Sequence, residues 1–159
     1  MVDASKISID QMDLISIIKM IFVLFLADLT FSFVHRHLLH GCWSKYHKLH
    51  HCFRNASVFS VIFLHPIDHL LEFGIQFHLP AFICSYCVNP LMSLIVMVFV
   101  YFQSAISHSS FIETGHYFHH KKISEEYNCF PLIFRDFSPL LSSVFGIKDD
   151  NLKKSIKNF

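Results

Sequence analysis

The run from Leu14 to Val34 limits most strongly what this chain can fold into, because it is strongly apolar and its only charged residues are Lys19 and Asp28. At about 1.5 Å per residue, a helix of this length covers a bilayer core of about 30 Å. A cleaved signal peptide is the alternative, but no small-residue cleavage site follows the run. We therefore expect residues 14–34 to form a transmembrane helix.

Two further apolar stretches, Leu70 to Val88 and Leu91 to Ser107, predict a helical hairpin. Asn89-Pro90 separates them, and this dipeptide favours a turn and prevents a helix from continuing. One side of the first arm is expected to face protein or a cavity rather than lipid, because the arm contains four residues poorly suited to lipid: Glu72, Gln76, His78 and Pro80.

Length and composition predict one all-α membrane domain. The chain has 159 residues, of which 53% are hydrophobic and 16% charged, and this balance excludes a disordered chain. We expect an integral membrane helical bundle, made of one span plus the hairpin, with a histidine-rich helical cap. The domain is predicted at residues 14–146, between an N-terminal tail, 1–13, and a polar C-terminal tail, 147–159.

The distribution of Lys and Arg predicts how the bundle is oriented. Residues 55–107 contain neither, whereas basic residues follow the first span and occur again after residue 120. By the positive-inside rule, both basic segments are cytoplasmic and the tip of the hairpin faces away. Because topology explains these basic residues, nucleic-acid binding is not expected.

The chain has 13 histidines, as many as its Lys and Arg residues together. Eight of the histidines form an HxxxxH motif followed by two HxxHH motifs: His35 and His40, then His47, His50 and His51, then His116, His119 and His120. On a helix, positions i, i+3 and i+4 point in one direction. Two such sets of three histidines that face each other can surround a metal ion. Imidazole is a suitable ligand for iron, zinc, copper and nickel.

The remaining histidines are less informative. His65 and His108 are placed where they could reach the same site. His37, His69 and His78 lack a clear role at ligand spacing, and an isolated histidine is more often a hydrogen-bonded residue near the membrane interface. Interfacial histidines would not explain a repeated HxxHH motif, so we interpret the three motifs as a metal site.

The motifs resemble those of the membrane-bound fatty acid hydroxylase superfamily, which includes sterol desaturases, C4-methyl sterol oxidases and sphingolipid hydroxylases. Asp28 and His35-Arg36 resemble the start of its first histidine box. His47–His51 resembles the second box, and His65-Pro66 with Asp68 resembles the segment that follows it.

The resemblance continues after the hairpin. His108 and His116–His120 resemble the third histidine region. Tyr127-Asn128 and Arg135-Asp136 keep the spacing of the later motifs, although Arg135 stands where the family has Trp. The resemblance covers residues 28–146.

The resemblance implies a di-iron centre without haem, held almost wholly by histidine. The ligands it implies are His35, His40, His47, His50, His51, His65, His108, His116, His119 and His120. Asp28, Asp68 and Glu113 are candidates for carboxylates near the iron.

The implied activity is O2-dependent hydroxylation or desaturation of a lipid. The substrate would be a sterol, a fatty acyl chain or a sphingoid chain. Electrons would come from NAD(P)H through cytochrome b5 or a similar carrier. The implied location is the endoplasmic reticulum membrane, with the histidines facing the cytoplasm.

Two alternatives remain open at this point. One is a membrane electron carrier that binds haem or another metal, although a haem with two histidine ligands gives no reason for two HxxHH motifs. The other is a non-catalytic lipid-binding relative, which the short chain and Arg135 favour.

Overall fold

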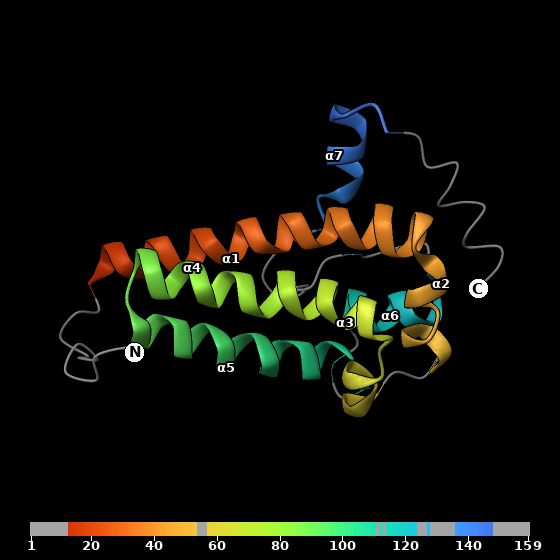
Figure 1. The fold of residues 1–159 in the computed structure, drawn as a ribbon, viewed down its shortest axis with the longest axis horizontal. Coiled ribbons are helices and arrows are strands. Elements are labelled where there is room, and N and C mark those ends of the chain that lie inside the picture. The colour runs from red at the N-terminus through yellow and green to blue at the C-terminus, as the bar shows by residue number, and fades with distance from the viewer. Residues whose placement is uncertain are drawn as a thin grey trace.

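The computed structural model describes residues 13–53, 57–110, 112, 114–123, 127 and 136–147, and their regular structure is entirely helical. Three long helical rods lie side by side, and most of the short helices gather at one end of them (Figure 1). The all-α prediction is therefore confirmed for the part of the chain that is described.

The first rod is α1, Leu14–Val34, which has the predicted bounds. Asp13 begins it, because the Asp13 carboxylate accepts a hydrogen bond from the Ser16 backbone N–H at 2.7 Å. The helix continues directly as a π-helical segment, His35–Cys42. In this wider turn the Trp43 N–H donates to the Leu38 carbonyl, five residues earlier, at 2.8 Å.

The other two rods form the predicted hairpin. Its first arm consists of α3, Pro66–Phe73, a π-helical turn, Gly74–His78, and α4, Leu79–Cys87. Its second arm is α5, Pro90–Ser107, which begins where the Asn89 side chain accepts a hydrogen bond from Met92 N–H at 2.8 Å. The first arm starts earlier than predicted, since Pro66 suits the first turn of a helix.

Apolar side chains from all three rods form the buried core, which contains Leu24, Phe31, Val61, Phe73, Phe77, Cys84, Met92, Val96 and Val100. Large apolar side chains also cover much of the outside of the rods, for example Phe22, Leu94 and Phe102. Among the described helices, α1 with its π-helical extension and α5 are long and apolar enough to cross a membrane.

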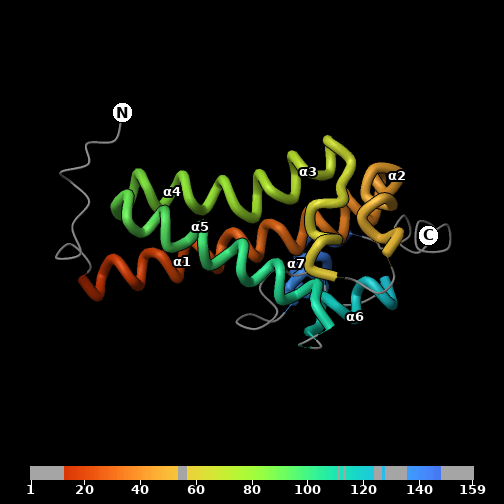
Figure 2. Tube along the Cα trace, turned by 90° about the horizontal axis from the view of Figure 1, so that it is seen from below, coloured from red at the N-terminus to blue at the C-terminus, as the bar shows by residue number. Residues whose placement is uncertain are grey.

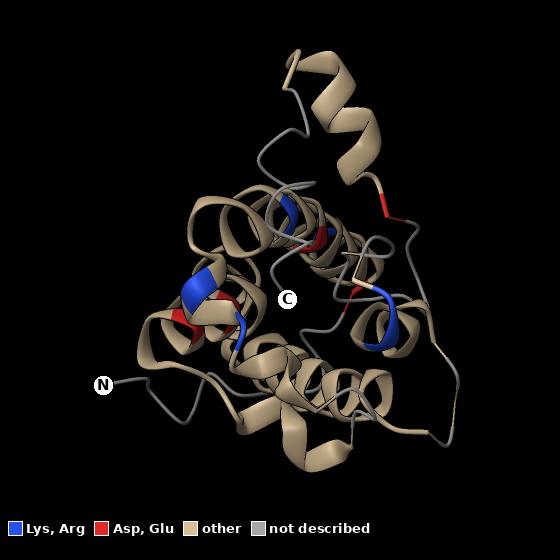
Figure 3. Ribbon diagram, turned by 90° about the vertical axis from the view of Figure 1, so that its right-hand side faces the viewer, with Lys and Arg blue, Asp and Glu red and all other residues tan. Residues whose placement is uncertain are grey.

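The short helices at the end of the bundle are α2, Ser44–His47, two 3₁₀ turns, His50–Cys52 and Val58–Ile62, and α6, Gly115–Lys121. Figure 2 shows that α2 and α6 lie at the same end of the bundle, near the ends of α1 and α5. Lys and Arg occur on these short segments in the view onto this end (Figure 3). The remaining helix, α7, Ser138–Val144, packs against α1 and projects away from the bundle (Figure 1).

Candidate metal centre

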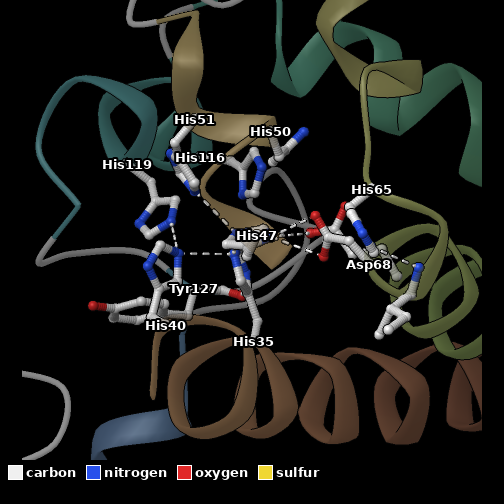
Figure 4. Close-up of polar contacts among 12 residues, drawn as sticks. His35, His40, His47, His50, His51, His65, Asp68, His116, His119 and Tyr127 are labelled. Carbon is white, nitrogen blue, oxygen red and sulfur yellow. Dashed lines mark hydrogen bonds and ion pairs between the residues drawn. The ribbon is translucent and has the colours of Figure 1, made fainter. Parts of the chain in front are cut away.

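Five histidines form one buried group: His35, His40, His47, His51 and His119. The Nε2 atom of His35 lies 3.0 Å from that of His47 and 3.2 Å from that of His40. The Nε2 atoms of His47 and His51 are 3.0 Å apart. The Nε2 atom of His119 lies 2.9 Å from that of His40. Figure 4 shows these rings pointing toward one another.

Four more histidines form a second buried group beside the first: His50, His108, His116 and His120. The Nε2 atom of His108 is 3.2 Å from the Nε2 atoms of both His50 and His116. Both ring nitrogens of His120 are buried and lack a hydrogen-bond partner among the described residues. The ligand atoms of each group lie within 4.8 Å of one another.

These nitrogen positions fit metal coordination. An ion that holds imidazole nitrogen at about 2.1 Å places neighbouring ligands of an octahedron about 3.0 Å apart, by geometry. The observed separations of 2.9–3.2 Å match that value. Buried polar atoms are normally hydrogen-bonded, so a metal would also explain one of the two unpartnered nitrogens of His120.

The two HxxHH motifs each contribute to both groups. His47 and His51 join the first group and His50 joins the second, whereas His119 joins the first and His116 and His120 the second. The expectation that all three rings of a motif point one way was therefore wrong. Residues i and i+4 share a face, but the residue at i+3 is displaced enough to reach the neighbouring group. This division keeps the groups adjacent, with the rings of His51 and His120 4.5 Å apart.

The π-helical segment explains the HxxxxH spacing. In an α-helix, residues five apart point about 140° from each other at 100° per residue. A π-helix forms hydrogen bonds from i to i+5 and so brings such residues nearly into line. His35 and His40 lie at the two ends of this interval, and their Nε2 atoms come within 3.2 Å.

Three of the imidazoles are oriented by acceptors at Nδ1. His35 Nδ1 donates to the Tyr127 carbonyl at 2.9 Å, and His108 Nδ1 donates to the Ser104 carbonyl at 2.8 Å. His47 Nδ1 donates to the Asp68 carboxylate at 2.9 Å. A proton on Nδ1 leaves a lone pair on Nε2, so these contacts direct Nε2 toward a metal.

Burial favours the neutral form of six imidazoles in the two groups. It lowers the pKa of His108 to about 4, and burial together with repulsion from neighbouring imidazoles lowers the pKa of His47, His50, His51, His116 and His120 well below its usual range. Neutral imidazole is the form that binds metal. The electrostatics of the site therefore agree with the geometry.

A model of the fatty acid hydroxylase family matches residues 20–146. That interval contains all nine histidines of the two groups and most of the chain. The chain belongs to the fatty acid hydroxylase family. Searches of curated proteins and of solved structures found no significant match.

Nine of the ten histidines predicted as ligands lie in the two groups, and His65 does not. His65 precedes α3, where its Nδ1 accepts a hydrogen bond from the Ile67 N–H at 3.2 Å. Its ring packs against Tyr46, with centroids 4.7 Å apart. His65 therefore begins a helix, and we leave it out of the proposed ligand set.

The three candidate carboxylates have different positions relative to the histidine groups. Asp68 is fully buried in the first turn of α3 and contacts His47, with Glu72 Oε1 3.7 Å from the same His47 nitrogen. Asp28 is buried on α1 but belongs to neither histidine group. Glu113 lies outside the described residues. Asp68 is thus the described carboxylate that orients a candidate ligand.

Tyr127 is a functional residue whose role the sequence did not reveal. Its side chain is fully buried, and its ring packs against His119 with centroids 4.8 Å apart. The Asp136 carboxylate accepts a hydrogen bond from the Tyr127 backbone N–H at 2.9 Å. Arg36 places its guanidinium carbon 5.2 Å from the centre of the Tyr127 ring.

The other histidines stay outside both groups. His37 Nε2 donates to Ser142 Oγ at 2.7 Å, His69 stacks on Phe73, and His78 is exposed. These three residues, which lacked a clear role at ligand spacing, therefore lie apart from the candidate ligands.

Proposed function

We propose that this protein is a membrane-bound, non-haem di-iron oxidoreductase that hydroxylates or desaturates a lipid with O2 and electrons derived from NAD(P)H. The observation that carries the proposal is the pair of adjacent, buried histidine groups in a member of the fatty acid hydroxylase family. Imidazole suits iron, and each group supplies at least four nitrogens. A sterol, a fatty acyl chain or a sphingoid chain is the proposed substrate.

Each histidine group would hold one iron ion. Iron bound there would supply the redox chemistry needed to oxidise a lipid C–H bond with O2. The chain's own residues hold and orient the ligands: Asp68, Tyr127 and Ser104 accept hydrogen bonds from the outer nitrogens of His47, His35 and His108. Burial of all nine imidazoles excludes bulk water from the site.

The fold supports a site at the membrane surface. We propose that α1, α5 and the first hairpin arm lie in the bilayer, with the histidine groups at the cytoplasmic end. Lys45, Lys48 and Lys121 belong to the short segments at that end, as the positive-inside rule requires. A lipid could then keep its head near water while its chain lies among apolar helices. The proposed location is the endoplasmic reticulum, with cytochrome b5 or a similar protein as electron donor.

The geometry favours this proposal over a haem-binding electron carrier. A haem with two axial histidines needs two nitrogens, whereas each group surrounds one region with four or five. A Soret absorption band in the purified protein would instead support the carrier.

Lipid analysis tests the proposal. The protein is expressed in hosts that lack individual sterol, fatty acyl or sphingolipid oxidation steps, and their lipids are compared by mass spectrometry. We expect one lipid class to gain an oxygen atom or lose two hydrogens. His51→Ala and His120→Ala should abolish the product, whereas His78→Ala, at an exposed position, should retain it. No new product in any host, or equal product from all variants, would count against the proposal.

A further inference from the structure

Helix α7 lies against the part of α1 that we propose to cross the membrane. Phe137, just before α7, packs edge-to-face on Phe25, with ring centroids 6.0 Å apart. Phe145, just after α7, packs in the same way on Phe33 at 6.1 Å. Phe25 and Phe33 both belong to Leu14–Val34. Figure 1 shows α7 transverse to α1 and projecting away from the bundle, in the half of the molecule that holds the short helices.

The polarity of α7 is opposite to that of a helix covered by water. Ser138 and Ser142 are buried against the protein, where Ser142 Oγ donates to the Ser138 carbonyl at 2.6 Å. The outer side chains are apolar: Leu140, Val144 and Phe145 are 59%, 69% and 65% exposed. Residues 137–147 contain no charged side chain. A water-exposed helix normally has its apolar side chains inward, so this segment fits an apolar medium.

An open cavity of about 540 Å³ lies between α7 and α1 beside their contacts, and its walls are apolar apart from one threonine. The lining residues are Leu29, Thr30, Phe33, Leu141, Phe145 and Ile147. Water is poorly held by walls that offer so few hydrogen-bonding partners. A hydrocarbon chain suits both the composition and the size of the cavity.

We propose that residues 137–147 are embedded in the cytoplasmic leaflet, where lipid acyl chains cover Leu140, Val144 and Phe145 and fill the cavity beside α1. A helix across a spanning helix lies near the membrane plane, and short amphipathic helices bind membranes in this orientation. Ser142 Oγ accepts a hydrogen bond from His37, beyond the end of α1, whereas Leu141 faces Leu29 within α1. The polar side is therefore the one nearer the cytoplasm. This inference rests on the proposed membrane crossing of α1.

Tryptophan fluorescence tests the inference. Trp43 is the one tryptophan of the chain, so Trp43→Phe gives a background into which Leu140→Trp or Val144→Trp is placed. The full chain is reconstituted in phosphatidylcholine vesicles, with or without lipids brominated on their acyl chains. We expect the brominated lipids to remove most of the emission at positions 140 and 144, and aqueous acrylamide to remove little. Lys45→Trp, at an exposed position of α2 on the proposed cytoplasmic end of the bundle, should show the reverse preference.

Phe22→Trp, on the exposed side of α1, separates this inference from the membrane proposal beneath it. Quenching by brominated lipid at position 22 but not at 140 or 144, with acrylamide reaching the latter two, would overturn the inference alone. Protection of 140 and 144 from both quenchers, together with cross-linked dimers through α7, would assign the face to a second copy and also overturn it. Absence of lipid quenching at position 22 would overturn the membrane crossing itself.

Discussion

The direction in which each imidazole presents its nitrogen depends on the groups around it. His47 is the clearest case, because its outer nitrogen meets a carboxylate from α3, a segment about 20 residues later in the chain. A carboxylate that accepts from a metal-binding histidine fixes the ring and makes it a stronger ligand. Asp68 would therefore support metal binding at the proposed site by orienting His47.

Replacing Asp68 tests this role. Asp68→Ala leaves the buried His47 Nδ1–H without its acceptor, and losses of this kind typically weaken metal binding by about 10- to 100-fold. The measurement is competition for Fe(II) or Co(II) between the protein and a chelator of known affinity. His65→Ala is the matched control, because His65 lies three residues away and outside both groups. Equal losses in the two variants, or none in Asp68→Ala, would contradict the role of Asp68.

Residue patterns predicted most of the candidate ligands because the chemistry of histidine is visible in the sequence. They could not reveal Tyr127, since its carbonyl accepts from His35 and every residue has a carbonyl. They also predicted His65 as a ligand, because proximity along the chain to His51 and Asp68 gives no direction for its ring, which lies outside both groups. Only the start of α3 at Pro66 turns that ring away from the other histidines.

Among the helices, α6 shows how one cap can position several ligands. Thr114 Oγ1 accepts a hydrogen bond from the Tyr117 N–H at 3.2 Å and donates to the Ser107 carbonyl at 3.0 Å. Thr114 thus caps the start of α6 and connects this helix to the end of α5 through a hydrogen bond. His116 and His120 are held in place by this connection.

Substitutions at Thr114 test the connection. Thr114→Ala removes both hydrogen bonds and should destabilise the protein by about 0.5–2 kcal/mol, the usual cost of losing a cap. Thr114→Ser keeps the hydroxyl and should be nearly neutral. Thermal unfolding in detergent, followed by circular dichroism, measures both. The connection would be unsupported if the serine variant were as unstable as the alanine variant.

Hydropathy predicted the long helices well, because a run such as Leu14–Val34 has few other ways to bury its backbone polar groups. It could not predict the π-helical segments at His35–Cys42 and Gly74–His78. A π-helix is rarely favoured by local sequence and persists here within tertiary packing. The sequence therefore showed the HxxxxH motif but not the backbone that brings His35 and His40 together.

For the whole molecule, the apolar rods and the histidine groups depend on each other. Nine buried imidazoles at one end of a bundle of this size are costly to pack without a ligand, because buried polar groups without partners destabilise a fold. The rods hold the segments that carry these residues, and the metal would in turn stabilise the rods.

Metal removal tests this dependence. Any ligand that binds the folded state stabilises it, by about 4 kcal/mol at a concentration 1,000 times its dissociation constant. Treatment with a chelator should therefore lower the unfolding temperature of the wild-type protein, and added Fe(II) should restore it. His51→Ala/His120→Ala should show a smaller response to both treatments. Identical unfolding of the wild type with and without chelator would argue against a structural contribution of the metal.

The most direct test of two metal-binding groups is the iron content of the purified protein, measured by elemental mass spectrometry against protein concentration. We expect about two iron ions per wild-type chain, fewer in His51→Ala and in His120→Ala, and a wild-type value in His78→Ala. Folded wild-type protein that binds no iron when supplied with it, or equal iron in all four proteins, would contradict the assignment of these histidines to a di-iron centre.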